Sequence, residues 1–466
     1  MIFNSFLYLF LFLPLMVTFY YILCKYLNGN FGILFLTVAS TIFYGYWDPR
    51  FLCLLFCSII LNYSFFLSIL NSVKYKYKIL IFSICSNLLL LFYFKYFSFT
   101  LQVSNQFLVT KFNIPNIILP LGISFFTFTQ IAFLVDAYKS KIKNQNFTYY
   151  VLFVTFFPHL LAGPIIHHSE MMEQFSNETK KHVNYTNLYN GLILFSIGLF
   201  KKTIIADYFV EEINCYYILT ETQTINFWDA WVATLAYSIQ IYFDFSGYTD
   251  MALGSALLFN ITMPINFNSP YKATSIQDFW RRWHITLSRF LKDYLYIPLG
   301  GNRINWWRTE LNIMIVFIIG GIWHGAGYTF IFWGFLHSFG YLITKIWSLC
   351  DFNYKDNAIT KIPSVLLTFI FINVTWVFFR ASSLTNAFNM LKSMGDLPTI
   401  TKFNTSIFLI ILIIAATMIF PNSNTIQKFF EKANIYISII FITITVILAL
   451  FTMGTNTNTP FIYFQF

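Results

Sequence analysis

The feature that most constrains this chain is a series of long, nearly uncharged apolar runs that recurs throughout the sequence. Only 10% of its 466 residues are charged, while 57% are hydrophobic and 21% are aromatic. A soluble domain carries about 25% charged residues. One large core cannot explain that deficit over this length, so the runs must face lipid. They are Phe3–Cys24, Phe31–Tyr46, Phe51–Leu70, Ile79–Phe97, Leu188–Leu199, Ala230–Phe245, Leu311–Ile322, Phe330–Trp347, Val365–Phe379, Thr405–Phe420 and Tyr436–Phe451.

These runs predict an all-α, polytopic integral membrane protein. A helix that crosses a bilayer needs about 20 mostly apolar residues, and several of the runs are shorter. We therefore expect roughly eleven transmembrane helices plus re-entrant or interfacial helices, arranged as a single multi-pass domain over residues 1–466. The opening segment lacks a basic n-region before its apolar run and an obvious small-residue cleavage site after it, so we interpret it as a retained first helix.

The net charge is +10, and the basic residues lie in the short connections between the apolar runs. Lysine and arginine in such connections are typical of the cytoplasmic side of a membrane protein, so we place these loops there. No basic soluble domain exists to hold a nucleic acid, and a nucleic-acid partner is not expected. The clusters are Lys74, Lys76 and Lys78; Lys139, Lys141 and Lys143; Lys180 and Lys181; and the stretch Arg281 through Arg308.

The six cysteines are scattered, mostly within apolar runs, and no two of them form a C-x-x-C pair. This pattern indicates neither a disulfide framework nor a thiolate metal site. We expect them to be small core residues and predict no metal centre. They are Cys24, Cys53, Cys57, Cys85, Cys215 and Cys350.

Polar residues inside apolar runs are expensive in a membrane, and they often mark a pathway or a reaction site. Gln130 and Asp136 interrupt the stretch PLGISFFTFTQIAFLVDAY, where Asp136 is either a site residue or a helix end beside Lys139. In FPHLLAGP, the Ala162-Gly163-Pro164 sequence would break a helix near His159. For His159 we favour a structural role over direct chemistry.

A third polar region has the sequence QIYFDFSGYTDMALG, from Gln240 to Gly254. Gln240 and Asp244 are four residues apart and share one helical face, and Gly247 offers a break before Asp250. Both carboxylates need partners, for which the nearby arginines are the obvious candidates. Structural ion pairing and substrate positioning are both open for these residues.

The fourth region is amphipathic and basic, and reads NFNSPYKATSIQDFWRRWHITLSRFLKDYLYIPLGGNR from Asn266 to Arg303. Ser275 followed by Asp278 predicts a helix start. The mixture of rings and cations is typical of a helix at the membrane surface near anionic groups. An interfacial anchor does not require His284, so we favour a binding surface for an anionic donor such as a CoA phosphate. The rings and cations are Trp280, Trp283, Tyr294, Tyr296, Arg281, Arg282, Arg289 and Lys292.

The strongest site candidate is His324, in the stretch GGIWHGAGYTFIFWG. It follows Leu311 by 13 residues, or roughly 20 Å of helix, which puts it inside a hydrocarbon slab of about 30 Å. Trp323 precedes it, and glycines surround it although each costs about 1 kcal/mol in a helix interior. Such a run predicts that backbones or a substrate approach closely. The glycines are Gly320, Gly321, Gly325 and Gly327.

Taken together, the last three of these stretches resemble the membrane-bound O-acyltransferase family. The similarity is greatest to the branch that contains the alginate O-acetylation protein and the peptidoglycan O-acetyltransferases, and PLGISFFTFTQIAFLVDAY, FPHLLAGP and PFIYFQF extend it. The resemblance covers about residues 120–341 and the last few residues. Thr249, Phe290 and Lys292 replace residues frequent in that branch, but none of these changes removes a proposed chemical group.

The resemblance implies tilted helices around a central tunnel, with residues 1–115 as N-terminal helices, 116–341 as the catalytic core and 342–466 as C-terminal helices. His324 corresponds to the family's catalytic histidine and His284 to its second characteristic histidine. The residues expected to bind substrate or donor are Trp280, Arg281, Arg282, Trp283, Asp244, Asp250, Asn266, Tyr271 and Trp323.

The expected activity is O-acetyl transfer to an exported cell-surface polysaccharide from a bacterial cytoplasmic membrane. Acetyl-CoA is the implied donor substrate, with no further cofactor. His324 is the expected base, or else the covalent carrier of the acetyl group. A separate periplasmic transferase is expected to complete the reaction, since the chain lacks a domain to grip a polymer. The alternatives are a D-alanyl transferase that uses a carrier-protein donor, and a glycan transporter or flippase.

Overall fold

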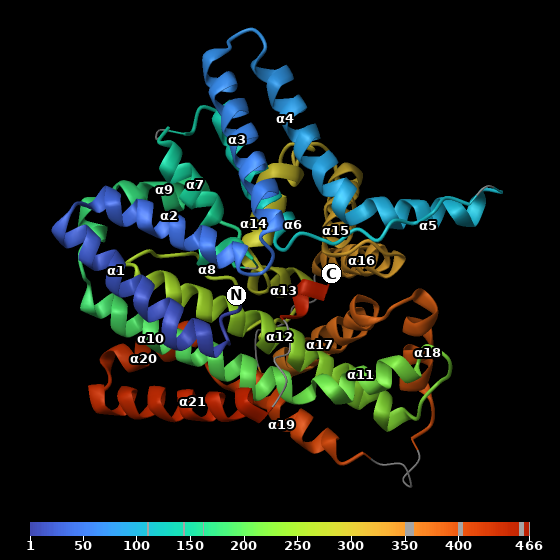
Figure 1. The fold of residues 1–466 in the computed structure, drawn as a ribbon. Helices are drawn as coiled ribbons and strands as arrows, with labels where there is room; N and C mark the ends of the chain where they lie inside the picture. Colours follow the sequence, from blue (N-terminus) through green and yellow to red (C-terminus); the bar gives the residue numbers. More distant parts are fainter. Residues whose placement is uncertain are drawn as a thin grey trace. The chain divides into compact units, whose positions relative to one another are not determined.

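A computed structural model describes residues 1–109, 111–142, 145–161, 163–349, 358–398, 404–455 and 461–465. Lys143, Ala162 and Cys350, and the first and last residues of PFIYFQF, lie outside these ranges. Within them the regular elements are helical and none is a strand, which confirms the all-α prediction (Figure 1).

The chain forms two compact units built from interleaved segments. The first contains Met1–Leu199, Tyr248–Pro264 and Phe430–Pro460, and the second contains Phe200–Gly247, Ile265–Phe429 and Phe461–Phe466. The single multi-pass domain stays a prediction.

The first unit contains the N-terminal helices and one helix from near the other end of the chain (Figure 1). Its main helices are α1 (Leu13–Tyr26), α2 (Gly29–Gly45), α3 (Arg50–Asn71), α4 (Lys76–Leu91), α5 (Phe97–Phe107), α6 (Ile123–Tyr138), α7 (Phe147–Thr155), α8 (Phe157–Leu160), α9 (His168–Ser176), α10 (Tyr185–Phe200) and α21 (Ile435–Thr455). The short elements η1 (Tyr8–Phe12), η2 (Phe92–Tyr96) and η3 (Glu178–Lys181) join them.

The second unit contains α11 (Val210–Leu219), α13 (Ile276–Arg282), α14 (Ile285–Leu291), α15 (Trp306–His324), α16 (Tyr328–Leu349), α17 (Ala358–Arg380), α18 (Leu384–Gly395) and α19 (Ser406–Ile419). Its short elements are η4 (Lys201–Ala206), η5 (Asp207–Phe209), η6 (Pro270–Lys272), η7 (Lys292–Tyr296) and η9 (Ile462–Gln465). Helices α12 (Phe227–Leu258) and α20 (Ser423–Lys432) contribute residues to both units.

Five described helices are long and apolar enough to cross a membrane, or six if the bent pair α19 and α20 counts as one span. The chain is therefore a multi-pass membrane protein, but roughly eleven crossings and a central tunnel stay predictions. The apolar run Phe31–Tyr46, for example, forms the helix α2, which is too short. Others lie in long helices that carry polar residues, such as α12 and α16. The five are Tyr8–Tyr26, Arg50–Asn71, Lys76–Phe107, Thr360–Arg380 and Ile435–Gly454.

Polar caps set where several of the helices begin. The Ser275 hydroxyl accepts a hydrogen bond from the backbone N–H of Asp278 at 3.1 Å, which confirms the predicted start of α13. Asn305 caps α15 in the same way, through the N–H of Arg308 at 2.8 Å. These caps satisfy N–H groups that the first helical turn leaves without partners.

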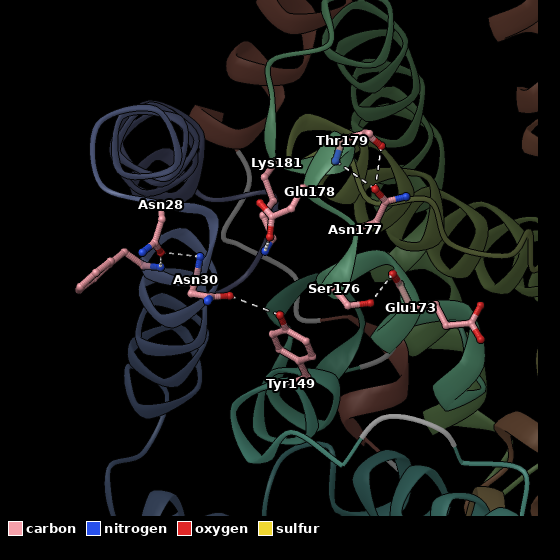
Figure 2. Close-up of polar contacts among 10 residues, drawn as sticks. Asn28, Asn30, Tyr149, Glu173, Ser176, Asn177, Glu178, Thr179 and Lys181 are labelled. Carbon is pink, nitrogen blue, oxygen red and sulfur yellow. Dashed lines mark hydrogen bonds and ion pairs between the residues drawn. The ribbon is translucent and has the colours of Figure 1, made fainter.

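In the first unit, polar contacts join the start of α2 to α7 (Figure 2). Asn28 caps α2 by accepting hydrogen bonds from the N–H groups of Asn30 and Phe31 at 2.9 and 3.1 Å. The Tyr149 hydroxyl of α7 donates to the Asn30 side chain at 3.4 Å. Lys181, which is buried in η3, pairs with Glu178 at 2.7 Å. The Asn28 cap and the bond from Tyr149 to Asn30 therefore both hold the N-terminal end of α2.

In the second unit, α15 packs against α16, and their backbones approach closely at two glycines. A Cβ atom added to Gly321 would lie 2.3 Å from the carbonyl oxygen of Phe330, and one added to Gly334 would lie 2.4 Å from that of Phe317. The glycine run therefore allows a close backbone approach, as predicted. This packing fixes the end of α15, where His324 lies.

Two local predictions are wrong. Helix α12 continues through Gly247 without the expected break, because one glycine costs only about 1 kcal/mol and the surrounding helix is well packed. The basic region does not form one surface helix. It divides into α13 and α14 at His284, whose φ of 44° lies in the left-handed region.

We predict that Gly334→Ala lowers the melting temperature of the purified protein. The new methyl group would overlap a carbonyl oxygen of α15, and overpacking of this kind costs about 1–3 kcal/mol. Thermal unfolding in detergent measures the shift. Gly395→Ala is the matched control, because a Cβ there meets no atom within 4 Å. Equal melting temperatures for the two variants would contradict the close packing.

Candidate active site

His324 is the last residue of α15, and its side chain is 4% exposed. Its ring lies among aromatic rings from α15, α16, α17 and η9. The distances between ring centroids are 4.9 Å to Trp323, 5.2 Å to Trp333, 5.1 Å to Phe379 and 5.7 Å to Tyr463. The imidazole is therefore enclosed by apolar surface and held away from bulk water.

His284 lies at the break between α13 and α14 and is fully buried. Its Nδ1 atom is hydrogen bonded to Asn266 Oδ1 at 3.1 Å. Burial disfavours the charged ring and lowers the pKa of His284 to about 3. This imidazole is neutral at physiological pH, so it does not attract an anionic donor by charge.

The two imidazoles belong to one aromatic cluster. The Phe245 ring of α12 lies 4.7 Å from His284 and 4.4 Å from Tyr463, which in turn contacts His324. Trp323 lies beside both histidines, 6.3 Å from the His284 ring. All of these residues are in the second unit. The cluster therefore holds two buried imidazoles within one aromatic environment.

Asp244, one residue before Phe245, is buried and bonded to two parts of the chain. Its Oδ1 atom pairs with Lys202 Nζ of η4 at 2.7 Å, and its Oδ2 atom accepts a hydrogen bond from the backbone N–H of Ile462 at 2.7 Å. Lys202 also pairs with Asp207 at 2.7 Å. Burial alone would lower the pKa of Lys202, but the carboxylates of Asp244 and Asp207 outweigh it and raise that pKa.

The prediction that arginines balance Asp244 is therefore wrong, because the cation is Lys202. The ion-pairing interpretation holds, and the second carboxylate oxygen holds the segment that carries Tyr463. Asp250, the other carboxylate of that motif, is buried in the first unit.

The tryptophans of the basic motif face the interior. Trp283 is 1% exposed and packs on Phe279 and Trp376, at 5.6 and 5.1 Å between ring centroids. The indole N–H of Trp280 donates to His337 Nδ1 at 3.2 Å. These residues support α13 against α16 and α17.

The two arginines of this motif differ in their surroundings. Arg281 is exposed, whereas Arg282 pairs with Asp278 at 2.9 Å. Tyr271 is buried, and its hydroxyl donates to the backbone carbonyl of Ser238 at 2.5 Å. Tyr271 thus holds η6 on α12.

The polar residues that the sequence analysis singled out before residue 199 lie in the first unit. His159 is hydrogen bonded through Nε2 to the carbonyl oxygen of Phe153 at 2.7 Å, which fits the structural role favoured for it. Gln130 donates to Ser58 at 2.9 Å and accepts from Tyr150 at 3.1 Å. Asp136 lies 3.3 Å from His168 and 3.8 Å from Lys141, so its neighbours extend beyond the expected Lys139.

Sequence reasoning missed Lys202, Tyr463 and His337 as members of this region. Lys202 carried a signal, since it directly follows an apolar run. Tyr463 belongs to the PFIYFQF stretch, but its place beside His324 depends on a contact between distant parts of the chain. His337 lay unremarked within a run interpreted only as a transmembrane helix.

Comparison with known proteins gives concordant matches. The model of the membrane-bound O-acyltransferase family matches residues 41–384. The chain is 46% identical to the peptidoglycan O-acetyltransferase of Helicobacter pylori, over 85% of this chain and 80% of that protein. It is 36% identical to a probable alginate O-acetylase of Pseudomonas aeruginosa, over 86% and 76% of the two chains. It is 28% identical to the teichoic acid D-alanyltransferase of Bacillus subtilis, over 55% and 67%.

We predict that Asp244→Ala releases the segment around Ile462. Ile462 is 4% exposed, so a cysteine placed there, with the native cysteines replaced by serine, should react slowly with a water-soluble maleimide. Loss of the carboxylate removes the acceptor for the backbone N–H of residue 462, and the labelling rate should rise several-fold.

Asp207→Ala is the matched control for this experiment. Each variant removes one of the two carboxylates that share Lys202 and leaves a neutral pair, but Asp207→Ala keeps the bond to Ile462. We expect labelling in this control to stay slow. Equal labelling rates in the two variants would show that Asp244 does not hold the segment.

Proposed function

The chain belongs to the membrane-bound O-acyltransferase family, and on that premise we propose that it moves acetyl groups from cytoplasmic acetyl-CoA toward an exported cell-surface polysaccharide. The enzyme class, O-acyltransferase, follows from the family and from its relatives. The acceptor that we propose is peptidoglycan or an alginate-like polymer. The compartment that we propose is the bacterial cytoplasmic membrane.

The observation that carries the proposal is the enclosure of His324 and His284 in one aromatic cluster. Attack of a sugar hydroxyl on a thioester needs a base that takes up the hydroxyl proton. An imidazole in a dry site stays neutral and is available for that task. His324 is the base that we propose, since it ends α15 at the centre of the cluster.

In the direct route, the O–H proton passes to the His324 imidazole while the hydroxyl oxygen bonds to the acetyl carbon. The C–S bond then breaks, and the proton passes to the thiolate, which releases CoA. In the covalent route, a ring nitrogen of His324 bonds to the acetyl carbon, the C–S bond breaks, and the CoA thiolate leaves with the proton that the ring gives up. The hydroxyl oxygen then bonds to the acetyl carbon, the C–N bond breaks, and the hydroxyl proton ends on the imidazole that leaves. The two routes differ in whether an acetylated enzyme can be trapped.

For the donor phosphates we propose the exposed guanidinium of Arg281, because Arg282 uses its Nε–H for Asp278. Arginine binds phosphate through paired N–H donors. The pantetheine arm would then run from this surface toward His324. A separate periplasmic transferase would complete delivery to the polymer.

The alternative donor is an acyl group on a carrier protein. The relative named as a teichoic acid D-alanyltransferase favours it, although at lower identity and coverage than the relatives named for O-acetylation. A glycan transporter or flippase is the alternative from a different class, and it would turn over no acyl donor.

We predict that the purified protein in detergent turns over radiolabelled acetyl-CoA and that His324→Ala lowers the rate by about 10²–10⁴-fold, the usual contribution of a positioned base. Release of labelled acetate or transfer to a polysaccharide fragment measures the rate. His182→Ala is the control: it removes an exposed histidine of the first unit and should leave the rate unchanged.

Two results would contradict the proposal. Wild-type turnover of a D-alanyl carrier protein without turnover of acetyl-CoA would identify the alternative donor. A His324→Ala variant as active as wild type would remove His324 from the chemistry.

A further inference from the structure

The Asn266 side chain is the point at which several hydrogen bonds around His284 meet. Its Oδ1 atom accepts from the backbone N–H of Thr286 at 3.2 Å and from the Thr286 hydroxyl at 2.9 Å. The same oxygen lies 3.1 Å from His284 Nδ1. Asn266 is 1% exposed, so water does not compete for these contacts.

These contacts determine which way the amide points. A backbone N–H can only donate, so the amide atom that faces Thr286 must be the oxygen and not the NH₂ group. That oxygen can only accept. The bond between Asn266 and His284 therefore requires a hydrogen on Nδ1 of the histidine.

The consequence is a defined tautomer. A neutral imidazole carries one hydrogen, and burial keeps His284 neutral by lowering its pKa to about 3. With the hydrogen on Nδ1, the Nε2 atom presents a lone pair. Among the described residues, no hydrogen-bond partner reaches the buried Nε2. A buried acceptor left in that state is unfavourable.

The backbone around His284 is also held in an unfavourable state. Its φ and ψ of 44° and 51° are left-handed, a conformation that is strained for a residue with a Cβ. Backbone bonds on both sides maintain it. Asn268 N–H donates to the carbonyl of Arg282 at 2.9 Å, and Ile285 N–H donates to that of Asn266 at 3.0 Å. Strain and an unused acceptor at one buried residue point to a function for the ring.

We propose that Asn266 is a positioning residue that fixes His284 as the Nδ1–H tautomer, so that Nε2 accepts a hydrogen bond from a bound substrate. This inference rests on the proposed acetyl transfer. The group that fits is an N–H or O–H: an amide of the pantetheine arm or, in the covalent route only, the attacking hydroxyl, because in the direct route its one proton goes to His324. Asn266 thereby acts through His284, in place of the direct substrate contact expected from the sequence.

A second set of groups defines the electrostatic surroundings of the ring. On the elements around His284, the neighbouring ionisable groups are Asp244 on α12, paired with Lys202; His324 on α15; Tyr463 on η9; and Arg282 and Arg289 on α13 and α14. The direct partner on Nδ1 is the uncharged amide of Asn266. A charge introduced at that position should therefore act strongly on the imidazole.

Asn266→Asp tests the proposal through the pH dependence of acetyl-CoA turnover. A carboxylate still accepts from Thr286 and from Nδ1–H, but it stabilises the imidazolium and should raise the pKa of His284 by about one to three pH units. The active form has Nε2 unprotonated, so the rate should fall as pH drops through the raised pKa. We expect a new acid limb between about pH 4 and 6 that wild type lacks.

The variant Asn266→Leu shows which of the two groups, the attacking hydroxyl or the pantetheine amide, donates a hydrogen bond to Nε2. If Nε2 binds the attacking hydroxyl, kcat should fall about tenfold or more at unchanged KM for acetyl-CoA. If Nε2 binds a pantetheine amide, KM should rise instead. Variants with wild-type kcat, KM and pH profile would overturn the proposal, as would equal losses in both variants with no change in the profile.

A measurement without turnover separates failure of this inference from failure of the proposed function. Nitrogen-15 spectra of the histidine-labelled protein, with the His284 signal assigned through His284→Gln, report which ring nitrogen carries hydrogen. We expect a protonated Nδ1 and an unprotonated Nε2. The opposite tautomer in the wild-type protein would overturn the inference even if acetyl-CoA is turned over. If Asn266→Leu does not fold, this spectrum and the pH profile of Asn266→Asp still test the inference.

Discussion

One buried carboxylate determines how the rest of the site is assembled. Asp244 binds Lys202 through one oxygen and the backbone of Ile462 through the other, so three segments that are distant in the sequence meet at one group. Loss of Asp244 would remove the acceptor of the Ile462 backbone N–H, while Lys202 would keep Asp207 as its partner. The position of Tyr463 beside His324 follows from this connection, and so does the packing of Phe245 on His284.

The charged groups near the two histidines are paired with one another, so the site around the imidazoles has little unpaired charge. Asp244, Lys202 and Asp207 satisfy one another, and the space around the histidines is aromatic. Low polarity keeps His284 neutral, and Asn266 then decides which of its nitrogens is a donor. Exclusion of water from such an enclosed site would protect the thioester donor that we propose from hydrolysis.

The sequence predicted the local helical position of the candidate residues better than their contacts. Motif and helix rules placed His324 on α15 and the start of α13 at Ser275, because both depend on local spacing. The partner of Asp244 and the place of Tyr463 depend on long-range pairing, which spacing does not encode. Gly247 did not break α12, since packing outweighs the cost of one glycine. Length and composition support five or six of the roughly eleven predicted crossings among the described helices, because other apolar runs lie in shorter helices or in long helices that carry polar residues.

The most direct test of the account is a cryo-electron microscopy map of the protein with bound CoA. We predict density for the pantetheine arm that ends beside Trp323 and His324, with the phosphates at the surface that carries Arg281. CoA bound elsewhere, with the aromatic cluster around His324 and His284 unchanged and empty, would contradict the assignment of this cluster as the site of acetyl transfer.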